Sequence, residues 1–183
     1  MVELINLQNQ NKFKLIEGVI LYPLKINRDE SGILVETLRT DWPHIYGNDR
    51  QFAMQYYSVT QPNVARDEEV WHCHNNQEDR FLVAKGEIVV AIADNREGSK
   101  TNGFLNLFLL KANDEPYILL IPKKTFHGFI VTSKEEAILL NFPTQLYNSQ
   151  DELRIPHKEA NVKIENRIFS WNFVREEFNL PNV

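Results

Sequence analysis

The segment from Val70 to Gly86, VWHCHNNQEDRFLVAKG, constrains this chain more than any other stretch. It holds two of the five histidines and the single cysteine, and it passes directly into an apolar run. Side chains alternate between the two faces of a strand, so His72 and His74 point to one face and Cys73 to the other. The strand rise separates the two imidazoles by about 7 Å, which lets them share a ligand or a metal ion. We therefore expect a functional site on the histidine face, with Cys73 packed in the core.

Further polar residues follow this pair at regular intervals. Asp79 lies five residues after His74, and Gly86 lies seven residues after Asp79. Much later, the segment PKKTFH ends in His127, beside another apolar run. Imidazole nitrogens and a carboxylate oxygen suit zinc, iron, manganese or nickel. The same groups can also act as acid and base in proton transfer, so the residue types leave both possibilities open.

The remaining chain alternates short apolar segments with turn residues. Such strands, at roughly ten-residue spacing, predict an antiparallel sandwich or barrel. We expect neighbouring strands to pair as hairpins across the turn 132–136 and at Gly86, and to form a hairpin or a corner across the turn 27–32. Short helical turns are expected at 149–153 and 174–178. The expected strands are 16–25, 33–38, 52–60, 81–84, 87–93, 103–110, 117–121, 126–131 and 137–142.

Composition bounds the class of protein. A chain of 183 residues that is 43% hydrophobic suits a single domain over 1–183, with a barrel core at about 16–147 and an extension over 148–183. The net charge of −5 and the lack of a basic block argue against nucleic-acid binding. No apolar run approaches the roughly 20 residues that span a membrane. The first residues lack a basic segment followed by an apolar run, so we expect no signal peptide and a cytoplasmic location.

The two histidines, the acid, the glycine and the late histidine together resemble the two signature motifs of the cupin barrel. In that superfamily these groups point into a small barrel and often hold a divalent metal. The resemblance implies an all-β, cupin-type antiparallel β-barrel, or jelly roll, with a short C-terminal helical or irregular extension.

Further segments are EGVI at 17–20, DESGILVE at 29–36, AIADNR at 91–96 followed by Ser99, and FHGF at 126–129. From about Ile16 to Tyr147, the order of these motifs resembles the dTDP-4-dehydrorhamnose 3,5-epimerase family of nucleotide-sugar enzymes. It implies a homodimeric enzyme of carbohydrate biosynthesis, acting without a cofactor on a dTDP-4-keto-6-deoxyhexose-type nucleotide sugar. The N-terminal strands of such homodimers reach toward the partner's site.

The resemblance also implies roles for particular residues. His72 matches the catalytic base, and His74 would be a second acid or base. Gln77 and His127 match substrate-binding positions of the family. The family's phosphate-binding lysine has no clean match, but Arg80 lies close to its place and could bind phosphate bidentately. Further candidates for contact with the nucleotide sugar are Arg66, Lys85, Asn141, Tyr56, Tyr57 and Trp71.

The chain departs from the family pattern at three places. The proton-donating tyrosine falls near Asn141, and an asparagine cannot donate a proton at neutral pH; Tyr147 could reach the site. The aspartate that orients the base falls near RIPHK, 154–158, which contains no aspartate. Such a carboxylate fixes the tautomer of a histidine and raises its basicity. The arginine of the family's Asp-x-Arg-Gly segment is Ser31.

Three functions therefore remain open. The first is an epimerase or isomerase that moves protons through an enolate, with His72 and His74 as acid and base. The second is a metal-dependent cupin enzyme whose zinc, iron, manganese or nickel ion is bound by His72, His74, Asp79 or Glu78, and His127. The third is a cupin that binds a nucleotide sugar without catalysis, which the missing tyrosine and aspartate suggest. His74 separates the first two, because members of the epimerase family usually lack the second histidine.

Overall fold

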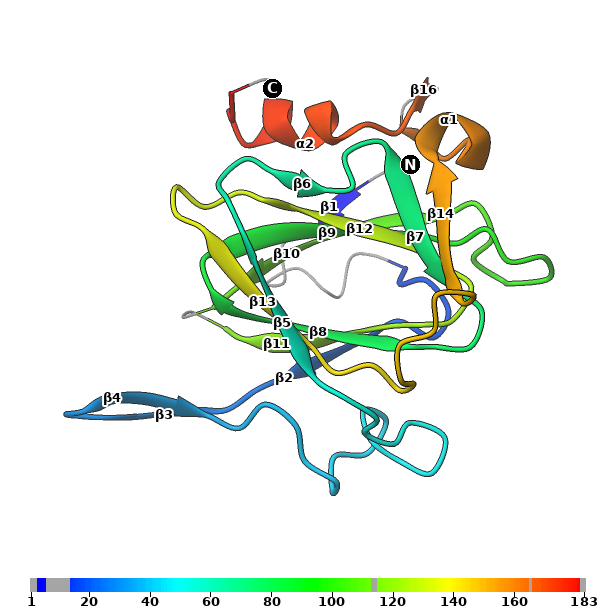
Figure 1. The fold of residues 1–183 in the computed structure, drawn as a ribbon. Helices are drawn as coiled ribbons and strands as arrows, with labels where there is room; N and C mark the ends of the chain where they lie inside the picture. The colour runs from blue at the N-terminus through cyan, green and yellow to red at the C-terminus, as the bar shows by residue number, and fades with distance from the viewer. Residues whose placement is uncertain (1–2, 6–13, 113–114, 165, 182–183) are drawn as a thin grey trace.

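Two β-sheets face each other in the computed structural model, which describes residues 3–5, 14–112, 115–164 and 166–181 (Figure 1). All pairings within them are antiparallel except that between β1 and β10. The first sheet runs in the order β1 (Glu3–Ile5), β10 (Leu105–Lys111), β9 (Glu87–Ala93), β12 (Phe126–Val131), β7 (Val70–His74) and β14 (Glu152–Pro156), and β6 (Ala65–Arg66) pairs with β12. The second runs in the order β2 (Ile20–Pro23), β11 (Tyr117–Ile121), β8 (Asp79–Lys85), β13 (Ala137–Asn141) and β5 (Tyr56–Thr60).

This arrangement confirms the expected all-β, cupin-type jelly roll, but two of the expected hairpins are wrong. β8 and β9 lie in different sheets, and so do β12 and β13. The chain crosses between the sheets at Gly86, which has a φ of 76°. A Cβ there would lie 2.7 Å from the Ser133 hydroxyl oxygen and 3.0 Å from the Glu136 carbonyl oxygen. A strand–glycine–strand pattern is therefore a sharp corner here, and alternation alone does not distinguish a corner from a hairpin.

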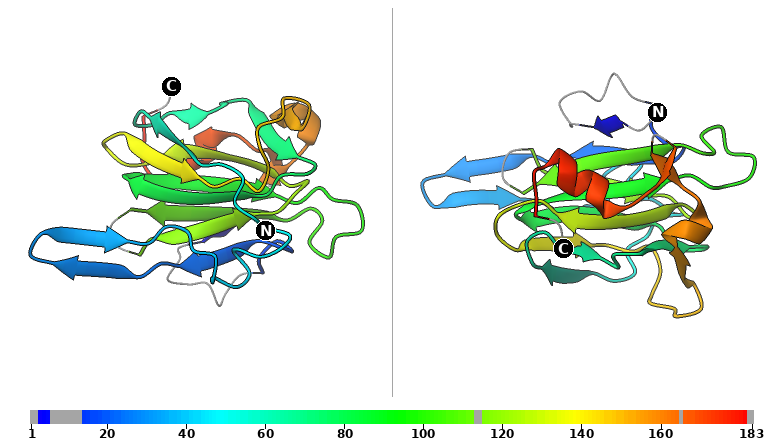
Figure 2. Two further views of the ribbon diagram at one scale, coloured as in Figure 1. Left: turned by 60° about the horizontal axis from the view of Figure 1, so that its bottom comes forward. Right: turned by 90° about the horizontal axis from the view of Figure 1, so that it is seen from above.

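A separate two-stranded hairpin, β3 (Ile26–Asp29) and β4 (Gly32–Val35), projects away from the two sheets (Figures 1 and 2). The strand expected at 16–25 contains β2, which ends at Pro23 and pairs with β11. The partner of β4 is therefore β3, most of which occupies the segment expected to be a turn. Proline lacks a backbone donor, so the end of β2 at Pro23 follows from its chemistry.

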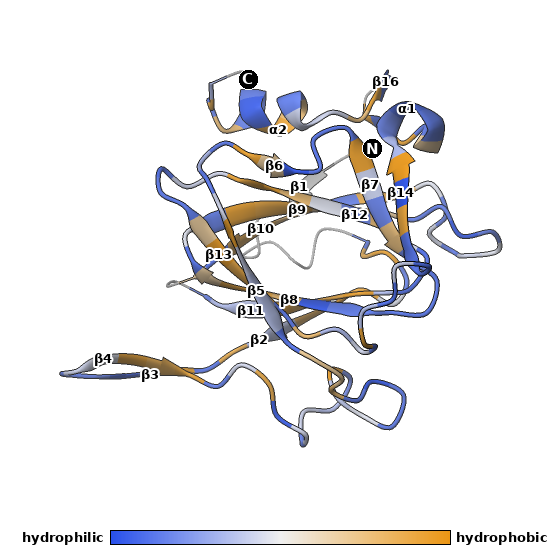
Figure 3. Cartoon of the chain, viewed as in Figure 1, coloured by the Kyte–Doolittle hydropathy of each residue, from blue (hydrophilic) through white to orange (hydrophobic). Residues whose placement is uncertain are grey.

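Both faces of each sheet are covered by apolar side chains. On β9, Ile88, Val90 and Ile92 point into the space between the sheets. The alternate residues of β9 pack on the outer face beneath α2 (Trp171–Glu177), which lies over the seven-stranded sheet (Figure 1). A second outer cluster includes Ile45 and covers the five-stranded sheet. Strands buried on both faces have continuously apolar sequences, and Figure 3 shows β9 and β10 in hydrophobic colours.

The C-terminal residues extend the first sheet and then cross its outer face. β14 pairs along β7, and α1 (His157–Ala160) follows it directly. The two-stranded pair β15 (Lys163–Ile164) and β16 (Arg167–Ile168) precedes α2. The expected helical turn at 174–178 overlaps α2, but the one at 149–153 is wrong. Asp151 instead accepts backbone N–H groups from the loop after β7, which draws this segment into the sheet.

No helix in the described ranges is both long and apolar enough to span a membrane.

The turn after β9 is held by one buried carboxylate. Asp94 accepts hydrogen bonds from the Arg96 side chain at 2.8 Å and from the hydroxyls of Ser99 and Thr101 at 2.6 Å. Arg96 also donates to the Glu17 carbonyl at 2.7 Å, which ties the turn to the segment before β2. Burial alone would raise the pKa of Asp94, but the bonds from Arg96, Ser99 and Thr101 hold it well below its usual value.

We predict that Asp94→Asn lowers the free energy of unfolding by about 2–4 kcal/mol at pH 7, because the variant leaves Arg96 without its buried charged acceptor. The folded-state pKa of Asp94 is depressed, so its contribution is present above the unfolded pKa of about 4 and is lost as the pH falls through the folded-state value. Urea denaturation should therefore show a smaller difference in the free energy of unfolding between the wild type and Asp94→Asn at pH 3 than at pH 7. Asp49→Asn, at an exposed position, is the control. An equal difference in unfolding free energy at pH 7 and pH 3 would contradict the depressed pKa of Asp94.

Candidate functional site

A pocket of about 190 Å³ opens at one end of the space between the sheets. Its polar side chains come from strands of both sheets and from the segment between β6 and β7. Because this volume is below the 300–1,000 Å³ typical of sites for drug-sized ligands, it suits a small group such as a sugar ring. The lining residues are Tyr56, Ser58, Arg66, Asp67, His72, His74, Asp79, Phe81, His127, Gly128, Phe129, Leu139 and Arg154.

Strand alternation places the histidines here. Trp71 and Cys73 pack in the outer apolar cluster, so His72 and His74 face the space between the sheets. The core position expected for Cys73 is therefore confirmed. Register then brings distant residues together, since His127 on β12 lies directly opposite His72 on β7.

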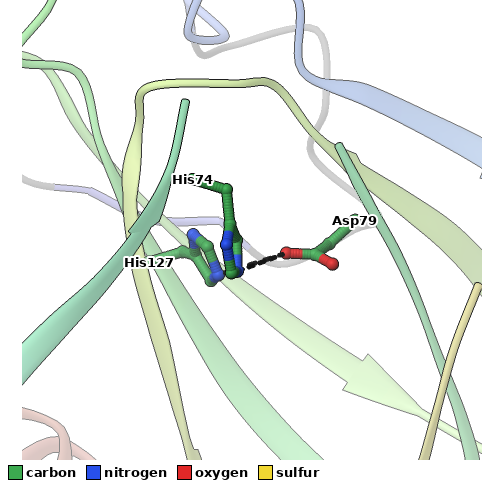
Figure 4. A group of neighbouring side chains, drawn as sticks. All are labelled: His74, Asp79 and His127. Carbon is green, nitrogen blue, oxygen red and sulfur yellow. Dashed lines mark ion pairs between the residues drawn. The ribbon is translucent and has the colours of Figure 1, made fainter. Parts of the chain in front are cut away.

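His74, Asp79 and His127 form a compact group at the buried end of the pocket (Figure 4). One carboxylate oxygen of Asp79, Oδ2, lies 3.3 Å from His127 Nε2 and 3.6 Å from His74 Nε2. The other oxygen, Oδ1, accepts from the amides of Gln77 at 2.8 Å and Asn141 at 2.7 Å. Burial alone would raise the pKa of Asp79, but its hydrogen bond with His127, the nearby imidazoles and the bond from Asn141 lower it to about 2. Asp79 is therefore ionised although only 2% of it is exposed.

His72 is held apart from this group by a different carboxylate. Its Nε2 lies 2.5 Å from Asp67 Oδ2, and its Nδ1 lies 3.8 Å from Glu152 Oε1. The short contact with Asp67 places the ring proton on Nε2, which leaves the lone pair on Nδ1. Burial, followed by the charge of His127, lowers the pKa of His72 and outweighs the raising effect of Asp67. His72 is thus a neutral base with an oriented ring.

Asp67 lies against the ring of His72, where the family pattern requires an aspartate from another segment. The segment 154–158, where the family pattern places that aspartate, instead contributes Arg154, which forms an ion pair with Asp67 at 3.4 Å. Asp67 has a φ of 58°, and its carbonyl accepts the Val70 N–H at 3.2 Å, so a tight turn places Asp67 beside the start of β7. The sequence signal that could have identified Asp67 is its place in a turn five residues before His72. From there its side chain can reach back over the strand.

Tyr56 provides the phenol that is missing at position 141. Asn141 lies directly opposite Tyr56 in the register of β13 and β5, and its amide donates to the Tyr56 hydroxyl at 2.9 Å. Burial, followed by the charge of Asp79, raises the pKa of Tyr56 to about 12, so its hydroxyl keeps its proton at neutral pH. The pocket therefore holds a protonated phenol on β5, next to β13, where the family pattern places the tyrosine.

Arg80 does not lie in the pocket. Strand alternation turns it to the opposite face from Asp79, and it is fully buried. All three of its guanidinium nitrogens donate to backbone carbonyls, including those of Ile45 and Phe142. This placement does not support the expected contact with phosphate. Arg80 instead fixes the loop before β5 to the end of β13.

The other expected residues differ in where they lie relative to the pocket. Arg66 and His127 line the pocket, and Arg154 joins them although it was not expected there. Gln77 and Asn141 act behind the pocket surface, since they hold Asp79.

The remaining candidates lie away from the pocket. Tyr147 is 68% exposed and donates to Glu152 at 3.2 Å, and it is outside the pocket lining. Trp71 is fully buried in the outer cluster, and Tyr57 is 65% exposed. Lys85 pairs with Glu136, near a separate surface hollow.

Comparison with known proteins identifies relatives over most of the chain. A "Probable low-salt glycan biosynthesis epimerase Agl13" from Haloferax volcanii is 40% identical over 145 residues, which is 78% of this chain and 88% of that protein. The spore coat polysaccharide biosynthesis protein SpsL from Bacillus subtilis is 30% identical over 160 residues, or 86% and 97% of the two chains.

Solved structures are similar in fold as well. The dTDP sugar isomerase from Desulfovibrio desulfuricans G20 superposes with a TM-score of 0.74 at 28% identity, over 86% of this chain and 92% of that one. An epimerase from Legionella pneumophila, in complex with dTDP-4-keto-L-rhamnose, has a TM-score of 0.69 at 22% identity, over 93% and 96% of the two chains, which shows a shared fold. Residues 14–177 match the family described as dTDP-4-dehydrorhamnose 3,5-epimerase. The chain belongs to the dTDP-4-dehydrorhamnose 3,5-epimerase family.

Proposed function

We propose that this enzyme epimerises or isomerises a dTDP-4-keto-6-deoxyhexose-type sugar by proton transfer through an enolate. The observation that carries the proposal is the presence, in one pocket, of an oriented neutral base and a protonated phenol. His72 with Asp67 is the base, and Tyr56 is the acid. Family membership and the likeness to a dTDP sugar isomerase support the substrate class.

In the proposed reaction, a keto group acidifies the hydrogen on the neighbouring carbon. His72 Nδ1 takes that proton, and the electron pair of the C–H bond moves to give an enolate. Asp67 stabilises the imidazolium that forms, as a carboxylate does for a histidine base in general. Tyr56 then returns a proton from its hydroxyl to a carbon of the enolate, and proton exchange with solvent restores both groups. The step needs no redox cofactor because no electrons are gained or lost overall.

The nucleotide is placed at the mouth of the pocket in this proposal, because the pocket volume suits the sugar ring alone. Arg66 and Arg154 line the pocket and reach the surface, where guanidinium groups can bind a diphosphate bidentately. Arg154 already pairs with Glu152 and Asp67. No carboxylate of the described residues pairs with Arg66, which makes Arg66 the stronger diphosphate candidate.

A homodimer that works in the cytoplasm completes the proposal. A two-stranded hairpin is marginally stable alone, yet β3 and β4 project from the sheets with Leu34 61% exposed. β5, an edge strand, presents Tyr57 and Val59 to solvent beside the pocket. Unpaired edges and exposed apolar hairpins suit pairing with a second copy. The single, buried cysteine fits a reducing compartment.

We predict that His72→Asn abolishes deuterium exchange from solvent into dTDP-4-keto-6-deoxyglucose, because no base remains to remove the carbon-bound proton. Asp67→Asn should lower the exchange rate by about 10²–10⁴-fold, since the ring loses both its orientation and the charge that stabilises imidazolium. Exchange is followed by mass spectrometry, and calorimetry checks that the sugar nucleotide still binds. Asp49→Asn is the control. Exchange by His72→Asn at the wild-type rate would remove His72 from the mechanism.

A separate prediction concerns Tyr56. In Tyr56→Phe, His72 can still remove a proton and return a deuteron to the same face, so exchange should continue. Net epimerisation or isomerisation should fall by at least about 10²-fold, because the acid is missing. Chromatography of the product sugar measures turnover, and Tyr57→Phe, on the neighbouring exposed residue, is the matched control. Turnover by Tyr56→Phe equal to that of Tyr57→Phe would assign the acid to another group.

A further inference from the structure

The buried end of the pocket brings together three atoms that accept hydrogen bonds or bind cations. They are one ring nitrogen each of His74 and His127 and one carboxylate oxygen of Asp79, and all three lie within 4.8 Å of one another (Figure 4). Each comes from a different strand, so the group depends on the fold and not on a local turn. His72 is not part of it, because its own Nε2 is bound to Asp67.

Hydrogen bonds on the far side of each residue fix which atoms face the centre. Nδ1 of His74 lies 3.1 Å from the Asp151 carbonyl oxygen, and Nδ1 of His127 lies 3.4 Å from the Thr125 carbonyl oxygen. A carbonyl only accepts, so each Nδ1 carries the proton, and the Nε2 of a neutral ring has a lone pair. Each Nε2 faces Asp79 Oδ2, so a metal ion that takes the place of the proton between His127 and Asp79 would meet two imidazole nitrogens and a carboxylate oxygen.

The supporting groups leave Oδ2 directed at the two imidazoles. The amides of Gln77 and Asn141 both donate to Oδ1, which they hold on the side away from the histidines. A proton between His127 and Asp79 satisfies these facing groups, and a metal cation can replace that proton. Imidazoles that donate one ring N–H to a carbonyl, together with a carboxylate that is itself hydrogen-bonded, are the usual surroundings of metal ligands.

We propose that His74, Asp79 and His127 bind one divalent first-row transition ion, such as zinc, through these three atoms. Bonds of about 2.0–2.2 Å from a tetrahedral metal place neighbouring ligand atoms roughly 3.3–3.6 Å apart. The observed separations from Asp79 Oδ2 to the two nitrogens are 3.3 and 3.6 Å. Three protein ligands leave a coordination position open, which is typical of catalytic metal sites and not of structural ones.

The open position gives the site a role that rests on the proposed function. Without a cation, the buried end of the pocket presents the carboxylate of Asp79 to a developing enolate. A divalent ion there would reverse that charge and polarise the keto oxygen as a Lewis acid, while His72 and Tyr56 move the protons. The metal ion would stabilise the negative charge of the enolate, and His72 and Tyr56 would keep their roles as base and acid.

The test begins with the full chain stripped by a chelator and then loaded with Zn²⁺ or Co²⁺. We expect one ion per chain by plasma mass spectrometry after removal of unbound metal, and a visible absorption band from the cobalt form. Asp79→Asn and His74→Gln should each weaken binding by more than about 100-fold, since even the loss of a supporting residue costs 10- to 100-fold. His44→Asn is the matched control, because His44 is exposed and its φ of 72° suits asparagine.

Metal binding, deuterium exchange and the folding of each variant together test the metal site and its role. Folding of each variant is checked by circular dichroism, and Zn²⁺ should raise the melting temperature of the wild type and of His44→Asn alone. A wild-type chain that binds no ion at saturating metal, or folded variants that bind as tightly as the wild type, would overturn the site. Full deuterium exchange by metal-free wild type would overturn its Lewis-acid role and leave the proposed function standing. One bound ion in an enzyme without exchange would sustain the site and contradict the proposed function.

Discussion

The ionised carboxylate of Asp79 is the constraint on which the rest of the pocket depends. A charge with 2% exposure is stable inside a protein only if other groups compensate it. Gln77 and Asn141 bind one of its oxygens, and His74 and His127 surround the other. His74, His127 and Asn141 come from separate strands and Gln77 from the loop before β8, so the jelly roll must close for the charge to be satisfied. The same network reaches Tyr56 through Asn141, which couples the charge balance of the buried end to the proposed acid.

Two residues that the family pattern leads one to expect are absent, and the structure places chemically equivalent groups close to where they are needed. A phenol from β5 stands beside Asn141, and a carboxylate from the turn before β7 stands beside His72. The physical requirement is a group at a position in space, and a barrel offers several strands from which to supply it. The interpretation of the chain as a binding protein without catalysis rested on those absences, so Tyr56 and Asp67 remove its main support.

Much of the fold could be predicted because strand alternation is a local signal. β11 and β12 have the bounds expected from the sequence, and the opposite orientations of His72 and Cys73 follow from the same rule. The rule also places Arg80 on the face opposite Asp79, so its absence from the pocket could have been foreseen. Pairing between strands and the role of Tyr56 could not, because they depend on which sheet a strand joins and on register, and both are set by contacts distant in sequence.

The central claim is that this pocket removes a proton from the carbon next to a keto group. Its most direct test is to incubate the wild-type enzyme with dTDP-4-keto-6-deoxyglucose in deuterium oxide and to locate the incorporated deuterium by NMR. The account predicts enzyme-dependent deuterium at one or more carbons adjacent to the keto group. A sugar nucleotide that binds but stays fully protonated at those carbons would contradict it.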